Sequence, residues 1–141
     1  MKTFELKTHY KKILADTISP VSVYLKIRDK FPNSILLESS DYHGNDNSFS
    51  YICCNPIASI KVEGAVVTKT YPDQSTETTS VPADKVTMEI DAFTKQFETQ
   101  KDTSFKFINN GMFGFTAYDA VKYFEDITIS KKDDSIEIPE M

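Results

Sequence analysis

The sequence predicts an α+β fold, in which helices pack on one face of an antiparallel sheet. Short runs rich in β-branched and aromatic residues follow one another through the first half of the chain. Two longer stretches carry apolar residues at helical spacing, and turn residues separate all of these segments. Antiparallel strands interrupted by amphipathic helices are typical of a sheet covered by helices on one side.

The composition indicates one globular domain. The chain has 141 residues, of which 40% are hydrophobic and 26% charged, and a formal net charge of -5. That charge offers no basic surface for nucleic acid or for an anionic membrane. The apolar runs are far shorter than the roughly 20 residues that span a bilayer, and the polar start is unlike a signal peptide. We therefore expect a cytoplasmic protein without nucleic-acid or membrane partners.

The first two elements are a strand and a helix. Apolar residues alternate with charged ones over residues 4–10, which is typical of a half-buried strand. Ser19 and Pro20 mark a helix start, because the serine hydroxyl can cap free amides and proline fits the first helical position. Residues 21–28 place their apolar side chains on one face, and residues 31–33 end the helix.

Four short strands are predicted next, with a hairpin turn at Glu63-Gly64. They cover Ile35–Glu38, residues 48–54, Ser59–Glu63 and residues 66–71. Residues 41–47 are rich in Gly, Asn and Asp and predict a surface loop. The polar residues 72–80 show no apolar period and predict an exposed connection.

The last third of the chain predicts two further helices and one strand. Val86, Ile90, Phe93 and Phe97 recur at helical spacing and indicate a helix of about three to four turns. Residues 105–108 predict a strand, residues 109–111 a turn and residues 120–124 a third helix. The charged stretch 126–141 resembles a linker, so we expect a domain over residues 1–125 and the start of a linker over 126–141.

No catalytic or metal-binding motif is evident. The sequence has no glycine-rich phosphate loop, nucleophile elbow or zinc spacing, and the pair Glu125-Asp126 is best read as a solvated surface. Cys53 and Cys54 are adjacent, so on a strand they point to opposite faces and a disulfide between them would be strained. They are expected to be reduced structural thiols, and no metal or cofactor is assigned to this stretch.

The run from Ser34 to Glu38 ends in a polar corner formed by Glu38 and Ser39. A free amino acid needs acceptors for its ammonium group, because a buried unpaired charge costs several kcal/mol. A strand end with a carboxylate, a hydroxyl and open backbone groups can supply them. From the residues alone, a surface carboxylate beside a turn-starting serine is the favoured interpretation.

Several stretches resemble the amino-terminal region of the anthranilate synthase component I family, in the same order and spacing. They are Asp-Thr-Ile-Ser-Pro-Val-Ser-Val-Tyr-Leu-Lys (16–26), Ile-Leu-Leu-Glu-Ser (35–39), Ser-Phe-Ser-Tyr-Ile through Asn-Pro (48–56), the glycine, aromatic and Tyr-Asp stretch 110–125, and Ile-Pro-Glu-Met (138–141). The resemblance implies that the chain is half of a larger α/β/β/α sandwich.

The resemblance also implies a function. Members of this family make anthranilate from chorismate and ammonia or glutamine with Mg²⁺, in tryptophan biosynthesis, and L-tryptophan inhibits them. The chorismate and Mg²⁺ residues lie in a carboxy-terminal chorismate-binding domain, so this chain alone should be catalytically silent. Its partners would be that domain, a glutamine amidotransferase subunit (component II) and L-tryptophan.

The resemblance assigns the L-tryptophan site to the Leu-Leu-Glu-Ser motif at Leu36, Leu37, Glu38 and Ser39. Ser39 would be the main polar contact, with Leu37 and the Glu38 backbone as adjacent wall. One departure is Ser48, where the family commonly has an arginine. Two alternatives stay open: the related component I of aminodeoxychorismate synthase in the folate pathway, and a module that only docks partner subunits.

Overall fold

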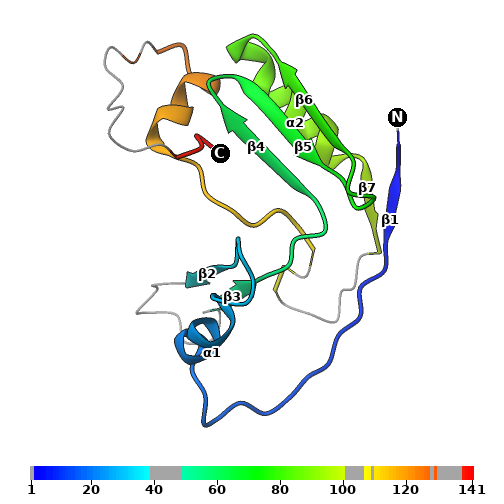
Figure 1. The fold of residues 1–141 in the computed structure, drawn as a ribbon, viewed down its shortest axis with the longest axis vertical. Coiled ribbons are helices and arrows are strands. Elements are labelled where there is room, and N and C mark those ends of the chain that lie inside the picture. Colours follow the sequence, from blue (N-terminus) through cyan, green and yellow to red (C-terminus); the bar gives the residue numbers. More distant parts are fainter. Residues whose placement is uncertain (1, 39–48, 101–106, 109, 128, 130–137) are drawn as a thin grey trace. The chain divides into compact units, whose positions relative to one another are not determined.

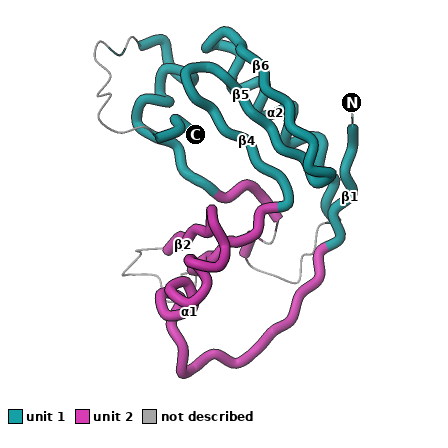
Figure 2. The backbone as a smooth tube through the Cα atoms, in the orientation of Figure 1, with its two compact units in different colours: residues 1–7, 57–100, 114–141 teal, residues 8–56, 101–113 magenta. Residues whose placement is uncertain are grey.

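The computed structural model describes the whole chain except residues 1, 39–48, 101–106, 109, 128 and 130–137. Helices and strands are mixed, and the strands form small sheets (Figure 1). The chain divides into two compact units, residues 1–7, 57–100 and 114–141 in unit 1 and residues 8–56 and 101–113 in unit 2 (Figure 2).

Unit 1 is built on a three-stranded antiparallel sheet. Its strands are β4 (Ser59–Glu63), β5 (Val66–Thr70) and β6 (Thr76–Ser80), paired in the order β4-β5-β6. A two-residue turn joins β4 to β5, and Gly64 and Ala65 both have positive φ there. Hairpin turns of this kind match the right-handed twist of the strands they connect.

One face of this sheet is covered by helix α2 (Val86–Thr94), which follows the short 3₁₀ helix η1 (Ala83–Lys85) (Figure 1). Alternate residues of the strands point toward the helix, as the period of two requires. The core cluster of unit 1 consists of Val62, Val67, Val86, Ala120 and Tyr123. The helix that was predicted from the apolar spacing of Val86, Ile90 and Phe93 is confirmed.

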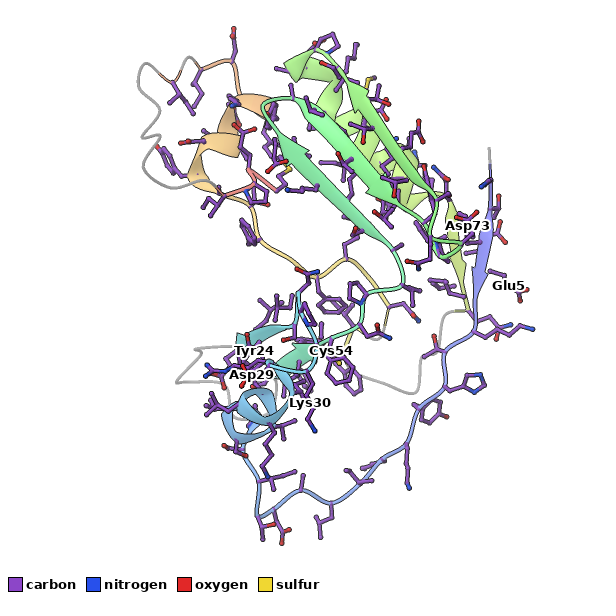
Figure 3. The ribbon with its side chains drawn as sticks, viewed as in Figure 1. Glu5, Tyr24, Asp29, Lys30, Cys54 and Asp73 are labelled. Carbon is purple, nitrogen blue, oxygen red and sulfur yellow. The ribbon has the colours of Figure 1, made fainter. Side chains whose placement is uncertain are left out.

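A parallel pair of strands adds an aromatic cluster to unit 1. Strand β1 (Phe4–Leu6) pairs with β7 (Phe97–Thr99). The ring of Phe4 stacks on those of Tyr71 and Phe97, with centroids 5.8 and 5.5 Å apart. An exposed ion pair of 2.8 Å also joins Lys2 to Asp73, in the loop between β5 and β6 (Figure 3). The Lys2 ammonium and Ser75 hold the pKa of the Asp73 carboxyl below its usual range.

The second 3₁₀ helix of unit 1, η2 (Tyr118–Tyr123), contributes Ala120 and Tyr123 to the core. Residues 140 and 141 lie beside β4, where the Val62 amide donates to the Met141 carbonyl at 3.0 Å. Residues 140 and 141 thus pack in unit 1, while the prediction that 126–141 begins a linker stays a prediction.

Unit 2 contains helix α1 (Pro20–Ile27) and an antiparallel pair, β2 (Ile35–Glu38) and β3 (Ser50–Cys53). The predicted helix start is confirmed, because the Ser19 hydroxyl accepts a hydrogen bond from the Ser22 amide at 3.2 Å. The Tyr24 hydroxyl donates to the Ser34 carbonyl at 3.3 Å, which ties the helix to the start of β2. None of the described residues of unit 2 is fully buried.

Several predictions of local structure were wrong. The polar stretch 72–80 contains strand β6, whose threonines pair with β5 across the hairpin. Phe97 belongs to β7 and not to helix α2. The helix predicted over residues 120–124 is present, as the 3₁₀ helix η2. The first strand is shorter than its alternating pattern and pairs in parallel, and the single antiparallel sheet is replaced by small separate sheets.

Other predictions fall partly outside the described residues. The loop 41–47 lies there entirely, as do half of the predicted strand 105–108 and part of the turn 109–111; residues 107 and 108 are described and are not in a strand. In the part of the chain that is described, no helix is both long and apolar enough to cross a membrane.

Candidate functional site

The candidate site lies at the end of strand β2, in unit 2. The register places Leu37 opposite Tyr51 and Glu38 opposite Ser50. Since paired residues share a face of the hairpin, Leu37 and Tyr51 lie on one face and Glu38 on the other. Ser39, the predicted main polar contact, lies outside the described residues, as does Ser48.

The Leu37 face carries an aromatic wall that the sequence did not single out. The ring of Tyr51 packs against that of Phe113, with centroids 5.2 Å apart. The Tyr51 hydroxyl accepts a hydrogen bond from the Ile108 amide at 3.2 Å. These two contacts hold Ile108 and Phe113 beside β3. The available signal was the alternation of Phe49 and Tyr51, which predicts that both side chains leave one face of a strand.

Leu36 and Glu38 occupy the opposite face of the strand. Leu36 is half-buried and lies opposite Ile52, whereas Glu38 is exposed at the strand end. The structure therefore does not bring the Leu37 and Glu38 side chains together. Glu38 can reach a ligand on the Leu37 face only through its backbone, which is the role that the resemblance implied.

The residues at the end of β2 are suited to binding a ligand. Leu37 is 37% exposed and stands next to an aromatic ring, so this face can take up an apolar group. Strands β2 and β3 form a two-stranded sheet in the described structure, and an unpaired strand edge presents backbone N-H and C=O groups. An apolar face beside open backbone groups suits a ligand with a ring at one end and charges at the other.

Helix α1 supports this hairpin. The capping box formed by Ser19 and Ser22 satisfies free amides at the helix start. Tyr24 lies on the side of the helix that faces β2 (Figure 3). The helix also carries exposed apolar side chains, Val21 and Leu25. It therefore contacts the hairpin through Tyr24 and leaves Val21 and Leu25, on the same face of the helix, exposed.

The two cysteines differ in environment. Cys53 ends β3 and is half-buried, whereas Cys54 follows it and is exposed (Figure 3); both are free. Burial raises the pKa of the Cys53 thiol, and the neighbouring Cys54 adds to the rise. Among the residues that the structure describes, no three His, Cys, Asp or Glu side chains gather as a metal site.

Curated proteins of known identity resemble the chain over most of its length. It is 30% identical over 131 residues to anthranilate synthase component 1 of Lactococcus lactis, an alignment that covers 93% of this chain. Its identity to the proteins of the same name is 29% over 129 residues in Thermus thermophilus and 28% over 129 residues in Pseudomonas putida. The chain is a relative of anthranilate synthase component 1. The resemblance inferred from the sequence motifs is thereby confirmed.

The match covers only part of each anthranilate synthase component 1. The chain spans about a quarter of the length of these relatives, 26% in each of the three. No protein-family model matches the chain, and no solved structure matches it either.

Proposed function

We propose that this chain is the amino-terminal, L-tryptophan-sensing region of an anthranilate synthase component I. The observation that carries the proposal is the similarity to anthranilate synthase component 1 over 91 to 93% of the chain in three relatives. The Leu-Leu-Glu-Ser motif, which the family resemblance assigns to the tryptophan site, falls at the end of a strand with an apolar face.

In this proposal the indole ring of tryptophan lies against the face of Leu37 and Tyr51. The ammonium group is met by the Glu38 backbone carbonyl and by Ser39. Indole is large and apolar, so its burial supplies most of the binding free energy, while the polar groups select an amino acid. Leu37 is already partly exposed beside the Tyr51 and Phe113 rings, which supports this placement.

The activity, cofactor and partners belong to the same proposal. The complete protein would be a cytoplasmic lyase that makes anthranilate from chorismate and ammonia or glutamine, with Mg²⁺ held by a carboxy-terminal chorismate-binding domain. Its partner would be the glutamine amidotransferase subunit, component II. The chain alone would be inactive, and tryptophan would act by favouring one of two arrangements of the complete protein.

The larger sandwich is also part of the proposal. Described residues of unit 2 leave many large apolar side chains exposed, among them Ile13, Leu14, Val21, Leu25 and Met112. Exposed apolar surface on this scale is typical of a contact with further protein. A second sheet with its own helices would cover such surface and complete the α/β/β/α arrangement.

A titration of the isotope-labelled chain with L-tryptophan, followed by NMR chemical shifts, tests the proposal. We expect the amides of Leu37, Glu38 and Ser39 to shift in a saturable manner at millimolar concentrations, while those of unit 1 stay in place. L-Phenylalanine is the matched control and should cause smaller shifts at the same concentration. Shifts elsewhere, or equal shifts with both amino acids, would contradict the assignment of this site.

A further inference from the structure

Glu140 is a buried carboxylate with an unusually complete set of donors. Its residue is only 4% exposed. The Gly64 amide donates to one carboxylate oxygen at 3.0 Å, and the Tyr123 hydroxyl donates to the same oxygen. The Lys122 ammonium donates to the other oxygen. Burial of a carboxylate is tolerated only when such partners replace water, so this group is held at a fixed place.

The turn that Glu140 contacts is conformationally strained. Gly64 and Ala65 form the two-residue turn between β4 and β5, with φ of 56° and 64°. The left-handed region suits glycine but is unfavourable for alanine, because its Cβ crowds the backbone. The Ala65 amide donates to the Tyr123 hydroxyl at 2.9 Å. Both turn amides are therefore held, one by Glu140 and one by the tyrosine that binds Glu140.

The backbone of residues 140 and 141 lies along the free edge of β4. The Val62 amide donates to the Met141 carbonyl at 3.0 Å, and the Glu140 amide donates to the Val62 carbonyl at 2.9 Å. The Ala117 amide donates to the Glu140 carbonyl at 2.8 Å. Pro139 has no N-H and cannot extend this ladder. These few backbone hydrogen bonds do not fix the register of residues 140 and 141 on β4 by themselves. The contacts of the Glu140 side chain are therefore needed to define that register.

We propose that residues 140 and 141 form a strap, fixed by the Glu140 side chain, that holds the strained Gly64-Ala65 turn closed, so that strap and turn open together without unfolding of β5 and β6. This device couples the position of residue 140 to the geometry of a hairpin far away in sequence. It goes beyond the proposed function and does not depend on tryptophan binding. The competing interpretation is that Glu140 is an ordinary part of the core, so that the strap and turn amides exchange only when unit 1 unfolds as a whole.

Native-state hydrogen exchange of the 141-residue chain distinguishes the two interpretations. Glu140→Gln should speed exchange about tenfold or more at the strap and turn amides, since a buried hydrogen-bond network loses its charge. The reporting amides are those of Val62, Gly64, Ala65, Ala117, Glu140 and Met141. In the unaltered chain these amides should exchange at least about tenfold faster than amides in the β5–β6 pairing, because they open without unfolding of the sheet. Glu63→Gln is the matched control, because Glu63 lies beside the turn in an exposed ion pair with Lys61.

Equal exchange rates at the strap and β5–β6 amides of the unaltered chain, or no rise in the strap of Glu140→Gln, would overturn the proposal. If Glu140→Gln does not fold, Tyr123→Phe decides, because it keeps the ring in the core and removes only the hydroxyl that contacts Glu140 and Ala65. A second variant tests the coupling itself. Ala65→Gly relieves the strain of the turn and should slow exchange of the Glu140 and Met141 amides about fivefold. Unchanged strap exchange in that variant would also refute the coupling.

Discussion

The Lys69 ammonium lies 2.5 Å from a carboxylate oxygen of Glu89 and is almost completely enclosed between strand β5 and helix α2. Burial by itself lowers the pKa of Lys69, but the hydrogen bond and charge of Glu89 outweigh it, so the pKa is raised. An ion pair therefore fastens α2 to the sheet, next to the packing of Phe93 on Tyr71.

Substitutions of Lys69 and of Glu89 should change the free energy of unfolding by different amounts. Lys69→Met replaces the lysine with an apolar side chain of similar length, so the free energy of unfolding should change by at most about 1 kcal/mol. Glu89→Ala leaves the enclosed ammonium without its partner and should cost about 2–3 kcal/mol, since Glu89 is partly exposed and solvent screens some of the loss. Urea denaturation of both variants measures the difference. A larger cost for Lys69→Met would contradict this account of the pair.

The stability of unit 1 should depend on pH through Glu140. Burial by itself raises the pKa of this carboxyl, but hydrogen bonds from its three donors outweigh burial and hold the pKa below the ordinary value of 4.5. A lowered pKa in the folded state contributes stability that is fully present above the unfolded value and lost as pH falls through the folded one. The free energy of unfolding should hence decline below about pH 4.5.

Glu140→Gln provides the control for that pH dependence. The variant lacks the titrating group, so the difference in unfolding free energy between it and the unaltered chain should be constant from about pH 6 to 8 and shrink as pH falls below about 4.5. Denaturation curves at each pH give this difference. A difference that stays the same down to pH 3 would show that the charge on Glu140 does not stabilise the fold.

Local signals in the sequence predicted the elements that local chemistry determines. Ser19 and Pro20 marked the start of α1, and Glu63-Gly64 marked the β4–β5 turn, because capping and turn residues act over a few positions. Strand β6 was missed because its threonines have no apolar period, and their pairing with β5 is what makes them a strand. Phe97 followed helical spacing but leaves the helix to pair with β1 from the start of the chain.

The candidate site was predictable to the same limited extent. The strand that carries Leu37 and Glu38 was placed correctly, since an apolar run bounded by turn residues is a strong strand signal. The contribution of Phe113 was not visible, because it depends on a contact with Tyr51 between segments far apart in sequence. The burial of Glu140 was missed for the same reason: its partners Gly64 and Tyr123 come from other elements.

The capping of α1 by Ser19 predicts a local loss of stability in unit 2. Ser19→Ala removes the acceptor for the Ser22 amide and should weaken the helix by about 1 kcal/mol. Hydrogen exchange of the α1 amides should speed up about fivefold, while amides of β5 stay unchanged. Ser19→Asp retains an acceptor at the cap and should restore slow exchange. Equal exchange in Ser19→Ala and the unaltered chain would show that the cap contributes nothing.

Substitutions on the two faces of β2 should affect inhibition by L-tryptophan differently. The measurement uses a protein that is as long as the anthranilate synthase relatives. Leu37→Ala and Ser39→Ala should each raise the tryptophan concentration for half-inhibition about tenfold, because each removes a proposed ligand contact, while anthranilate formation without tryptophan is largely kept. Leu36→Ala is the matched control: it removes the same side chain from the opposite face, opposite Ile52. If Leu36→Ala relieves inhibition as strongly as Leu37→Ala, loss of hairpin stability and not of a tryptophan contact explains both.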